Sequence, residues 1–269
     1  MSRFRILVSG RRLAPVAMAV LVMAACGGTR GGETTIAGTD TGTPLQGELL
    51  VSAAASLADV FAAIGSDFEA ANPGVEVQLN LGSSASLRQQ VLEGAPADVY
   101  ASADTANMAR LVEAGETTGD PVVFARNRME IAVPAGNPAA ITGLGDFADP
   151  RLLIGLCAEQ VPCGAYALEV LGNAGVTPSV DSNEPDVRAL LTKIAAGELD
   201  AGITYLTDVL SAGGGVEGLA IPEDVNVTVD YPIATLAGAP NPEIAARFVD
   251  FVFSGQGQAI LDGYGFSSP

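Results

Sequence analysis

Residues 75–104 read VEVQLNLGSSASLRQQVLEGAPADVYASAD and indicate the fold class directly. Apolar and polar side chains alternate over residues 75–81, which is typical of a β-strand. Residues 86–93 predict a short helix, and Gly94 supplies a stop signal directly after it. A second strand is predicted at 98–102. Strand, helix and strand in this order indicate an α/β unit.

The same alternation continues on both sides of this unit. Further strands are predicted at 48–54, 129–134, 152–156, 201–205, 225–231 and 233–236. Further helices are predicted at 56–71, 104–114, 164–172, 186–197 and 242–253. Strands separated by helices indicate mostly parallel sheets. The length of the pattern suits two α/β lobes better than one oversized sheet.

Composition excludes several classes of function. The chain has 269 residues with 13 Lys or Arg against 31 Asp or Glu, a net charge of −18. This excess of acid argues against a nucleic-acid partner, which requires a basic face. The sequence contains no His. A Ser-His-Asp or Cys-His nucleophile system and a His-ligated zinc are therefore excluded.

The first 26 residues have the pattern of an export signal. Residues 1–12 contain four Arg and no acid, and the uncharged apolar stretch that follows them ends in Ala24-Ala25-Cys26. This pattern predicts a signal peptide at 1–25. The segment Leu21–Cys26 resembles a bacterial lipobox, in which Cys26 would be diacylated and anchored in the membrane. An ordinary cleaved signal with an incidental Cys is the alternative. Residues 26–46 predict a flexible linker, so we expect an extracytoplasmic body on a lipid tether.

Four strand-to-helix corners carry hydroxyl groups or helix N-termini. They lie at Ser56, at Ser83-Ser84-Ala-Ser86, at Val161–Gly164 and at Pro185–Arg188. Ligands of open α/β sheets bind at such corners, and helix N-termini offer unpaired N–H groups to anions. Each corner also has a purely structural reading, because Ser56 with Asp59 fits a capping box and the other residues fit helix caps.

Several segments resemble the molybdate-binding proteins of bacterial ABC importers. The long block 82–104 carries most of this resemblance. Supporting segments are Val51–Leu57, Val161–Ala167, Asp186–Leu190, Gly197–Tyr205 and Gly263–Phe266. The resemblance covers residues 47–266. It implies an α/β fold of the two-lobed, type II periplasmic-binding-protein kind, with the ligand in the cleft between the lobes.

The resemblance also implies a division of the chain. Lobe 1 would comprise residues 47–127 plus 232–269, and lobe 2 would comprise residues 128–231. The chain would cross between the lobes near 126–129 and return near 230–233.

Five ligand-binding positions follow from the resemblance: Ser56, Ser84, Cys163, Val187 and Tyr205. The two Ser would bind oxyanion oxygens through hydroxyl and backbone N–H groups, Cys163 and Val187 through backbone N–H groups, and Tyr205 through its hydroxyl. The implied ligand is molybdate or tungstate, with no cofactor, no catalytic residue and no direct cation ligand. The implied partner is an ABC permease, and the implied state is a monomer.

One pair of cysteines and one pair of arginines each allow more than one interpretation. Cys157 and Cys163 are expected to form a disulfide in an exported protein, against two free thiols or a metal pair. Arg88 and Arg188 could line the site with positive charge, but both follow helix starts by enough to point away. We expect them to be solvated or to brace the lobes.

Three other functions are also compatible with parts of the sequence. One is a binding protein of the same fold for sulfate, phosphate or a small organic anion. Another is an enzyme with Asp59 or Asp98 as a carboxylate base, which the missing His and the lack of a convergent carboxylate pair argue against. A third is an adhesion or sensory lipoprotein that binds nothing small.

Overall fold

The computed structural model describes residues 44–269. The expected signal peptide at 1–25, the lipidation site Cys26 and the linker up to residue 43 lie outside the described residues. Within the described part, no helix combines the length and the apolar character that a membrane span requires.

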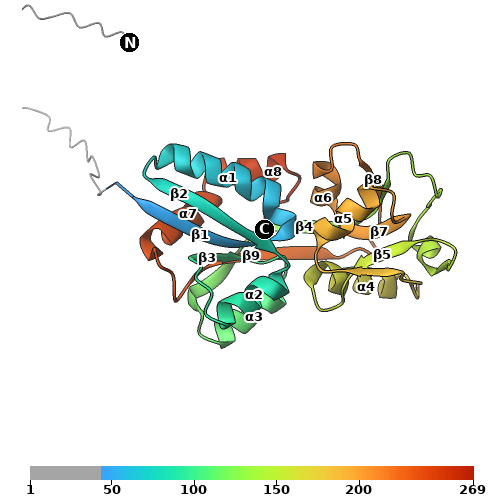
Figure 1. The fold of residues 1–269 in the computed structure, drawn as a ribbon, viewed down its shortest axis with the longest axis horizontal. Helices are drawn as coiled ribbons and strands as arrows, with labels where there is room; N and C mark the ends of the chain where they lie inside the picture. The colour runs from blue at the N-terminus through green and yellow to red at the C-terminus, as the bar shows by residue number, and fades with distance from the viewer. Residues whose placement is uncertain (1–43) are drawn as a thin grey trace, which may run out of the picture. The chain divides into compact units, whose positions relative to one another are not determined.

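The strands form a nine-stranded mixed sheet with the order β2-β1-β3-β9-β4-β7-β5-β6, and β8 pairs with β4. Their bounds are β1 Gly47–Ala54, β2 Val75–Gly82, β3 Val99–Ala101, β4 Thr117–Pro134, β5 Ile154–Cys157, β6 Ser182–Glu184, β7 Ala201–Tyr205, β8 Val216–Ala220 and β9 Thr228–Leu236. The two halves of this sheet lie side by side as two lobes (Figure 1).

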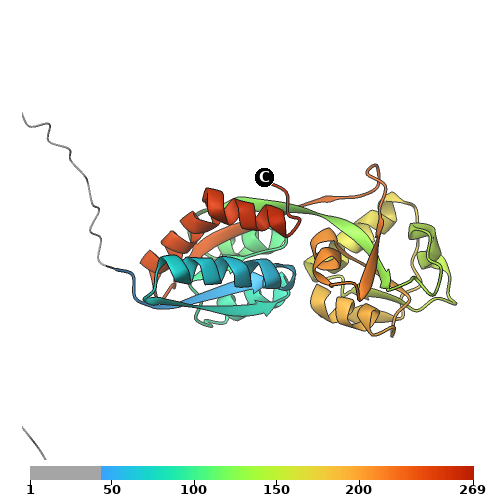
Figure 2. The same ribbon diagram turned by 90° about the horizontal axis from the view of Figure 1, so that it is seen from above.

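Strands β4 and β9 connect the lobes (Figure 2). Residues of β4 as far as Arg128 pair with β9 in the lobe 1 sheet, and from Met129 onward β4 pairs with β7 and β8 of lobe 2. The division that we propose, 47–127 plus 232–269 against 128–231, has both of its internal boundaries inside these two strands. Strand β4 therefore contributes residues to both halves of the sheet and links the two lobes directly.

Strand direction departs from the prediction in part. The pairs of β1 with β2 and β3, and of β5 with β6 and β7, are parallel as predicted. Every pair that contains β4 or β9 is antiparallel, so the prediction of mostly parallel sheets was wrong for these connecting strands. The predicted α/β fold of two lobes is confirmed.

Helices cover both faces of the sheet in lobe 1 (Figure 1). The helices of this lobe are α1 Ala58–Ala71, α2 Ser84–Leu92, α3 Thr105–Glu113, α7 Pro242–Phe253 and α8 Gly255–Gly263, and a short 3-10 turn, η1 Ala55–Leu57, precedes α1. One face is filled by edge-to-face aromatic rings, with Phe248 centred 6.1 Å from Phe61 and 5.3 Å from Phe68. Leu87, Tyr100 and other side chains form a separate cluster under α2 and α3.

Lobe 2 has the same construction on a smaller scale. Its helices are α4 Pro162–Asn173, α5 Val187–Ala195 and α6 Leu206–Ser211, with a 3-10 turn, η2, at Leu144–Ala148. Each of the three helices directly follows a strand or the short loop after it. The large apolar residues of α5 are buried, namely Val187, Leu190, Leu191 and Ile194. The N-termini of the three helices therefore lie at the carboxyl ends of β5, β6 and β7.

Candidate functional site

A small cavity lies where the strand ends of the two lobes meet. It offers about 20 Å³ to the centres of water-sized spheres, against the roughly 10–15 Å³ that one water needs. Its walls are Ala54, Ala55, Ser56, Ser83, Ser84 and Ala103 from lobe 1, and Pro162, Cys163, Asp186, Val187 and Tyr205 from lobe 2. A ligand of a few heavy atoms would be enclosed between the lobes here.

Ser56 lies in η1, directly after β1, and its hydroxyl takes part in a buried chain of hydrogen bonds. Ser56 Oγ is 3.0 Å from the Tyr231 hydroxyl, and Asn127 Nδ2 donates to the same hydroxyl at 3.5 Å. Burial raises the pKa of Tyr231, so this hydroxyl keeps its proton. All three groups are satisfied when Tyr231 donates to Ser56. The Ser56 hydrogen is then free to point into the cavity.

The structure shows which residues at the predicted corners cap a helix and which face the cavity. The capping box that was the structural alternative for Ser56 and Asp59 is not formed, because the helix start after η1 has no side-chain cap. At the next corner Ser83 caps α2 by accepting from the Ser86 N–H at 3.2 Å. Ser84, the first residue of α2, is left to face the cavity.

Ser84 is held on both sides by lobe 1. Its Oγ accepts a hydrogen bond from the Ala103 N–H at 2.9 Å, and its carbonyl oxygen accepts one from the Tyr100 hydroxyl at 2.8 Å. A serine hydroxyl has one hydrogen of its own. Because Ser84 Oγ acts as an acceptor toward Ala103, that hydrogen is available to a ligand.

The third corner is braced by a covalent bond. Cys157, the last residue of β5, forms a disulfide with Cys163, the second residue of α4, and their Cα atoms lie 5.7 Å apart. A Cβ on Gly164 would lie 2.1 Å from the Ala158 carbonyl oxygen, so only glycine lets the first turn of α4 pack this closely on the loop. The Cys163 N–H belongs to that first turn, where a helix provides no acceptor.

Val187 opens α5 at the fourth corner. Asp186 is the N-cap, and its Oδ1 accepts from the Ala189 N–H at 2.9 Å. Val187 borders the cavity, and its N–H precedes the first intrahelical bond of α5. Asp186 also borders the cavity, and it is the one carboxylate in the lining.

Tyr205 ends β7 and closes the cavity from lobe 2. Its side chain is 1% exposed, and its hydroxyl has no hydrogen-bond partner among residues 44–269. Burial holds the pKa of Tyr205 well above its usual value, so the group is a proton donor. A buried hydroxyl without a partner costs stability, which a purely structural tyrosine would not explain.

The structure thus brings all five predicted positions to one cavity. The sequence did not predict the groups that support these positions, at Ala103, Tyr231 and Asn127. Ala103 acts through its backbone N–H, which no side-chain pattern reveals. Tyr231 and Asn127 lie in segments for which the sequence predicted only a strand or the crossing between the lobes.

The two arginines and the two alternative catalytic carboxylates lie outside the cavity lining. Arg88 donates to Asn107 Oδ1 at 2.9 Å within lobe 1, whereas Arg188 reaches across to Asp59 and to a lobe 1 carbonyl. Asp98 accepts from the Leu50 N–H at 2.8 Å and from the Asn241 N–H at 2.5 Å, which ties two segments of lobe 1 together. Over residues 44–269, no cluster of three or more acidic or Cys side chains could hold a metal ion.

Comparison with known proteins gives the family. Residues 49–267 match the model of the bacterial extracellular solute-binding proteins. The molybdate-binding protein ModA of Mycobacterium tuberculosis is 40% identical over 228 residues, which cover 84% of this chain and 87% of that protein. This match confirms the resemblance read from the sequence.

Two solved structures share the fold. The substrate-binding domain of a putative molybdenum ABC transporter from Clostridium difficile is 26% identical, with a TM-score of 0.62, and the match covers 82% of this chain and 99% of that one. The sulfate-binding protein SubI of Mycobacterium tuberculosis H37Rv is 22% identical, with a TM-score of 0.74 and coverage of 82% and 86%. Two lobes, a cavity of helix N-termini between them and these matches lead to one conclusion: the chain belongs to the bacterial extracellular solute-binding proteins.

Proposed function

We propose that this protein captures molybdate, and also tungstate, outside the cell membrane and delivers it to an ABC permease. The observation that carries the proposal is the Tyr205 hydroxyl, a buried donor that has no partner in the described part of the chain. It borders a cavity where Ser56 and Ser84 each have a hydroxyl hydrogen available. The ModA relatives, named as molybdate-binding proteins, support the choice of anion. The protein would act without a cofactor and without catalysis.

The chemistry of the donors suits a fully deprotonated oxyanion. Molybdate and tungstate present only acceptors near neutral pH, and the five positions present only hydrogens toward the cavity. Hydrogen bonds to a charged acceptor are stronger than neutral ones. A dianion can therefore be held by hydroxyl and N–H groups although no Lys or Arg lines the cavity.

Sulfate is the second candidate, and a sulfate-binding neighbour with the same fold favours its inclusion. Sulfate also lacks a proton, so only its smaller size can weaken its contacts across the two lobes. Phosphate carries a proton near pH 7 and needs an acceptor. Asp186 is a carboxylate of the lining, and its Oδ1 caps α5. We propose that this cap holds the group against the helix start, so that Oδ2 does not serve as the acceptor. We expect molybdate and tungstate to bind similarly, sulfate far more weakly and phosphate undetectably.

Calorimetric titration of the purified protein with the four anions at fixed pH tests this order. Tight sulfate or phosphate binding without a response to molybdate would overturn the assignment. Elemental analysis for Mo, W, S and P identifies an anion carried through purification. Both measurements use the same preparation.

A matched pair of serines tests the cavity itself. Ser84→Ala removes a hydroxyl donor to a charged ligand, which contributes about 1.5–3 kcal/mol. We expect molybdate binding to weaken roughly ten- to hundredfold. Ser86→Ala is the control, because the Ser86 hydroxyl donates to the Ser83 carbonyl within the same helix start. Equal affinities of the two variants would remove Ser84 from the site.

The anchor is a separate proposal. Members of this family work outside the cytoplasm, and we propose that Cys26, which follows the small pair Ala24-Ala25, is lipidated and holds this one at the membrane. Cys26→Ser is then expected to move the protein from the membrane fraction to the soluble fraction. A variant that still fractionates wholly with membranes would refute the lipobox assignment.

A further inference from the structure

A second polar cluster joins the lobes beside the cavity. We propose that Arg188 closes the lobes over the ligand by bridging Asp59 and the Ala55 carbonyl of lobe 1, with Asp208 held beneath its guanidinium, and that this interlobe clasp sets how slowly the ligand leaves. The proposal rests on the function proposed above. Arg188 is a positioning residue here, since it does not border the cavity.

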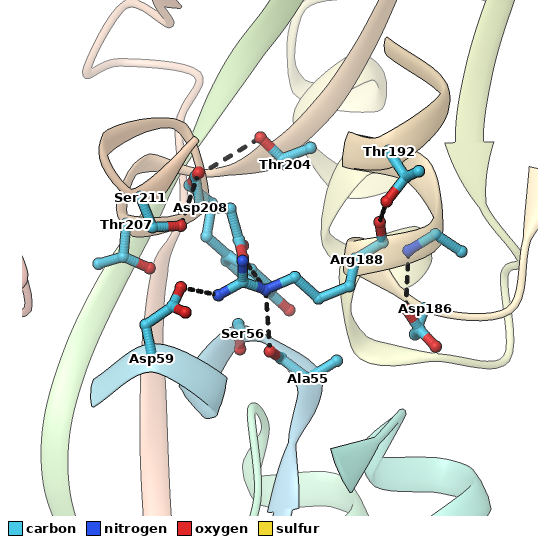
Figure 3. Close-up of polar contacts among 12 residues, drawn as sticks. Ala55, Ser56, Asp59, Asp186, Arg188, Thr192, Thr204, Thr207, Asp208 and Ser211 are labelled. Carbon is cyan, nitrogen blue, oxygen red and sulfur yellow. Dashed lines mark hydrogen bonds and ion pairs between the residues drawn. The ribbon is translucent and has the colours of Figure 1, made fainter. Parts of the chain in front are cut away.

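The contacts of Arg188 come from both lobes (Figure 3). Its Nε lies 3.3 Å from the Ala55 carbonyl oxygen, and Nη2 donates to Asp59 Oδ2. On its own lobe, Nε lies 3.5 Å from Asp208 Oδ1. Three oxygens from α6, η1 and α1 thus surround one guanidinium, which is the arrangement that the planar, five-donor arginine side chain favours.

Each end of the clasp is next to a predicted ligand contact. Arg188 follows Val187 in the first turn of α5, and Ala55 precedes Ser56 in η1. Asp208 lies one turn after Tyr205 in α6. A movement that opened the cavity would therefore separate Arg188 from lobe 1, because the same turns carry both sets of contacts.

Burial of Asp208 explains why the clasp has a preferred position. The Asp208 side chain is fully buried, and neither of its oxygens has a hydrogen-bond partner among the described residues. Arg188 is the nearest cation. When it is ionised, a buried carboxylate needs a compensating charge, so the Asp208 carboxylate favours the arginine rotamer that reaches toward the cleft rather than one that extends into solvent.

The prediction concerns dissociation. Asp59 is 47% exposed on the side chain, so Asp59→Asn should fold normally while it weakens the bridge. We expect molybdate to dissociate about two- to fivefold faster, in line with the modest strength of a partly exposed ion pair. The chain has five Tyr and no Trp, so stopped-flow tyrosine fluorescence during chase with excess tungstate can follow release from the cavity beside Tyr205.

Asp149→Asn is the matched control. It removes the same charge and breaks an ion pair with Arg151 that lies wholly within lobe 2. We expect its dissociation rate to equal that of the unmodified protein. A rate raised equally by both variants would show an effect of net charge and would overturn the clasp.

Coupling separates the clasp from a general loosening of structure. In an Arg188→Gln background, Asp59→Asn should have no further effect on dissociation, and Arg188→Lys should restore part of the slow release. Additive effects of the two single changes would overturn the proposal. If calorimetry shows no binding of molybdate to the unmodified protein, the molybdate assignment fails. The same variants are then compared with whichever anion of the panel binds, so that the clasp is judged separately.

Discussion

Tyr205 shows how one atom can oppose folding and favour binding. Among residues 44–269 its buried hydroxyl has no hydrogen-bond partner, an arrangement that costs about 1–3 kcal/mol. An oxyanion in the cavity would supply the missing acceptor. Ser56 and Ser84 differ, because each hydroxyl oxygen already has a partner in the protein.

Tyr205→Phe is therefore expected to change stability and affinity in opposite directions. Without ligand, its melting temperature should equal or exceed that of the unmodified protein, since an unsatisfied polar group is removed. Molybdate binding should weaken roughly ten- to hundredfold. Thermal unfolding with and without molybdate measures both effects. A strong loss of ligand-free stability would mean that the hydroxyl has a partner of its own.

Asp208 gives the folded protein a pH dependence of definite sign. Burial raises the pKa of Asp208 to about 7 in spite of the Arg188 guanidinium, while nearby Asp59 and Asp186 add to the rise. Because the folded state holds this proton more tightly than the unfolded state, the group favours folding most below its unfolded pKa. That contribution is lost as the pH rises from about 4 to about 7.

Asp208→Asn should flatten this part of the stability profile. The full effect of the shift is up to about 4 kcal/mol, taken as roughly three pKa units. Urea unfolding at pH 5 and pH 8 measures it, as the difference between the variant and the unmodified protein at each pH. A difference in unfolding free energy that does not grow between pH 5 and pH 8 would show that Asp208 does not titrate in this range.

Among the elements, those with a regular apolar pattern were predictable from sequence. The bounds predicted for β7 and α7 are the bounds observed. The first part of β4 was missed, because Gly119, Asp120 and Pro121 suggest a turn, and the strand indeed has irregular register there. Helix α8 was missed because it begins with Gly255 and Gly257. A Cβ at Gly257 would lie 2.2 Å from the Phe251 carbonyl oxygen, so close packing on α7 explains this glycine.

Only those parts of the site that lie in short contiguous segments could be predicted from the sequence. The corners are contiguous segments, so their residues could be named. The groups that hold them come from far along the chain: Tyr231 is 175 residues from Ser56, and Arg188 is 129 residues from Asp59. No periodicity in a single sequence encodes such pairings, which depend on the path of β4 and β9 between the lobes.

The loop between β5 and α4 makes a testable contribution of its own. Replacing both Cys157 and Cys163 by Ser removes the disulfide and should cost about 2 kcal/mol of stability, as expected for so short a loop. Molybdate affinity should also fall, because the Cys163 N–H is no longer held in place. Reductant should affect the unmodified protein in the same way and leave the double variant unchanged. Equal affinity of both proteins would show that the helix alone fixes this donor.

The whole molecule repels the anion that we expect it to bind. Without residues 1–25 the chain has nine basic and 31 acidic residues, a net charge of −22. None of the described residues that line the cavity is a cation. Long-range fields govern the rate of encounter, whereas short-range hydrogen bonds govern retention. Association and dissociation should therefore respond differently to salt.

We expect molybdate to associate severalfold faster when sodium chloride is raised from about 10 mM to about 200 mM, because screening shortens the range of the repulsion. The dissociation rate should change little over the same range. Stopped-flow fluorescence at several molybdate concentrations gives both rates. Slower association at higher salt would show that a local positive field, with Arg188 as its nearest source, outweighs the net charge.

The disulfide also bears on when the protein becomes competent. Thiols remain reduced in the cytoplasm and oxidise outside it, so a newly made chain carries Cys157 and Cys163 apart until export. The first turn of α4 is then held less firmly, and with it one wall of the cavity. We expect a reduced precursor that binds molybdate less tightly, and a mature protein that acquires its full affinity only on the far side of the membrane. The protein would therefore bind molybdate with full affinity only after export, once the disulfide has formed.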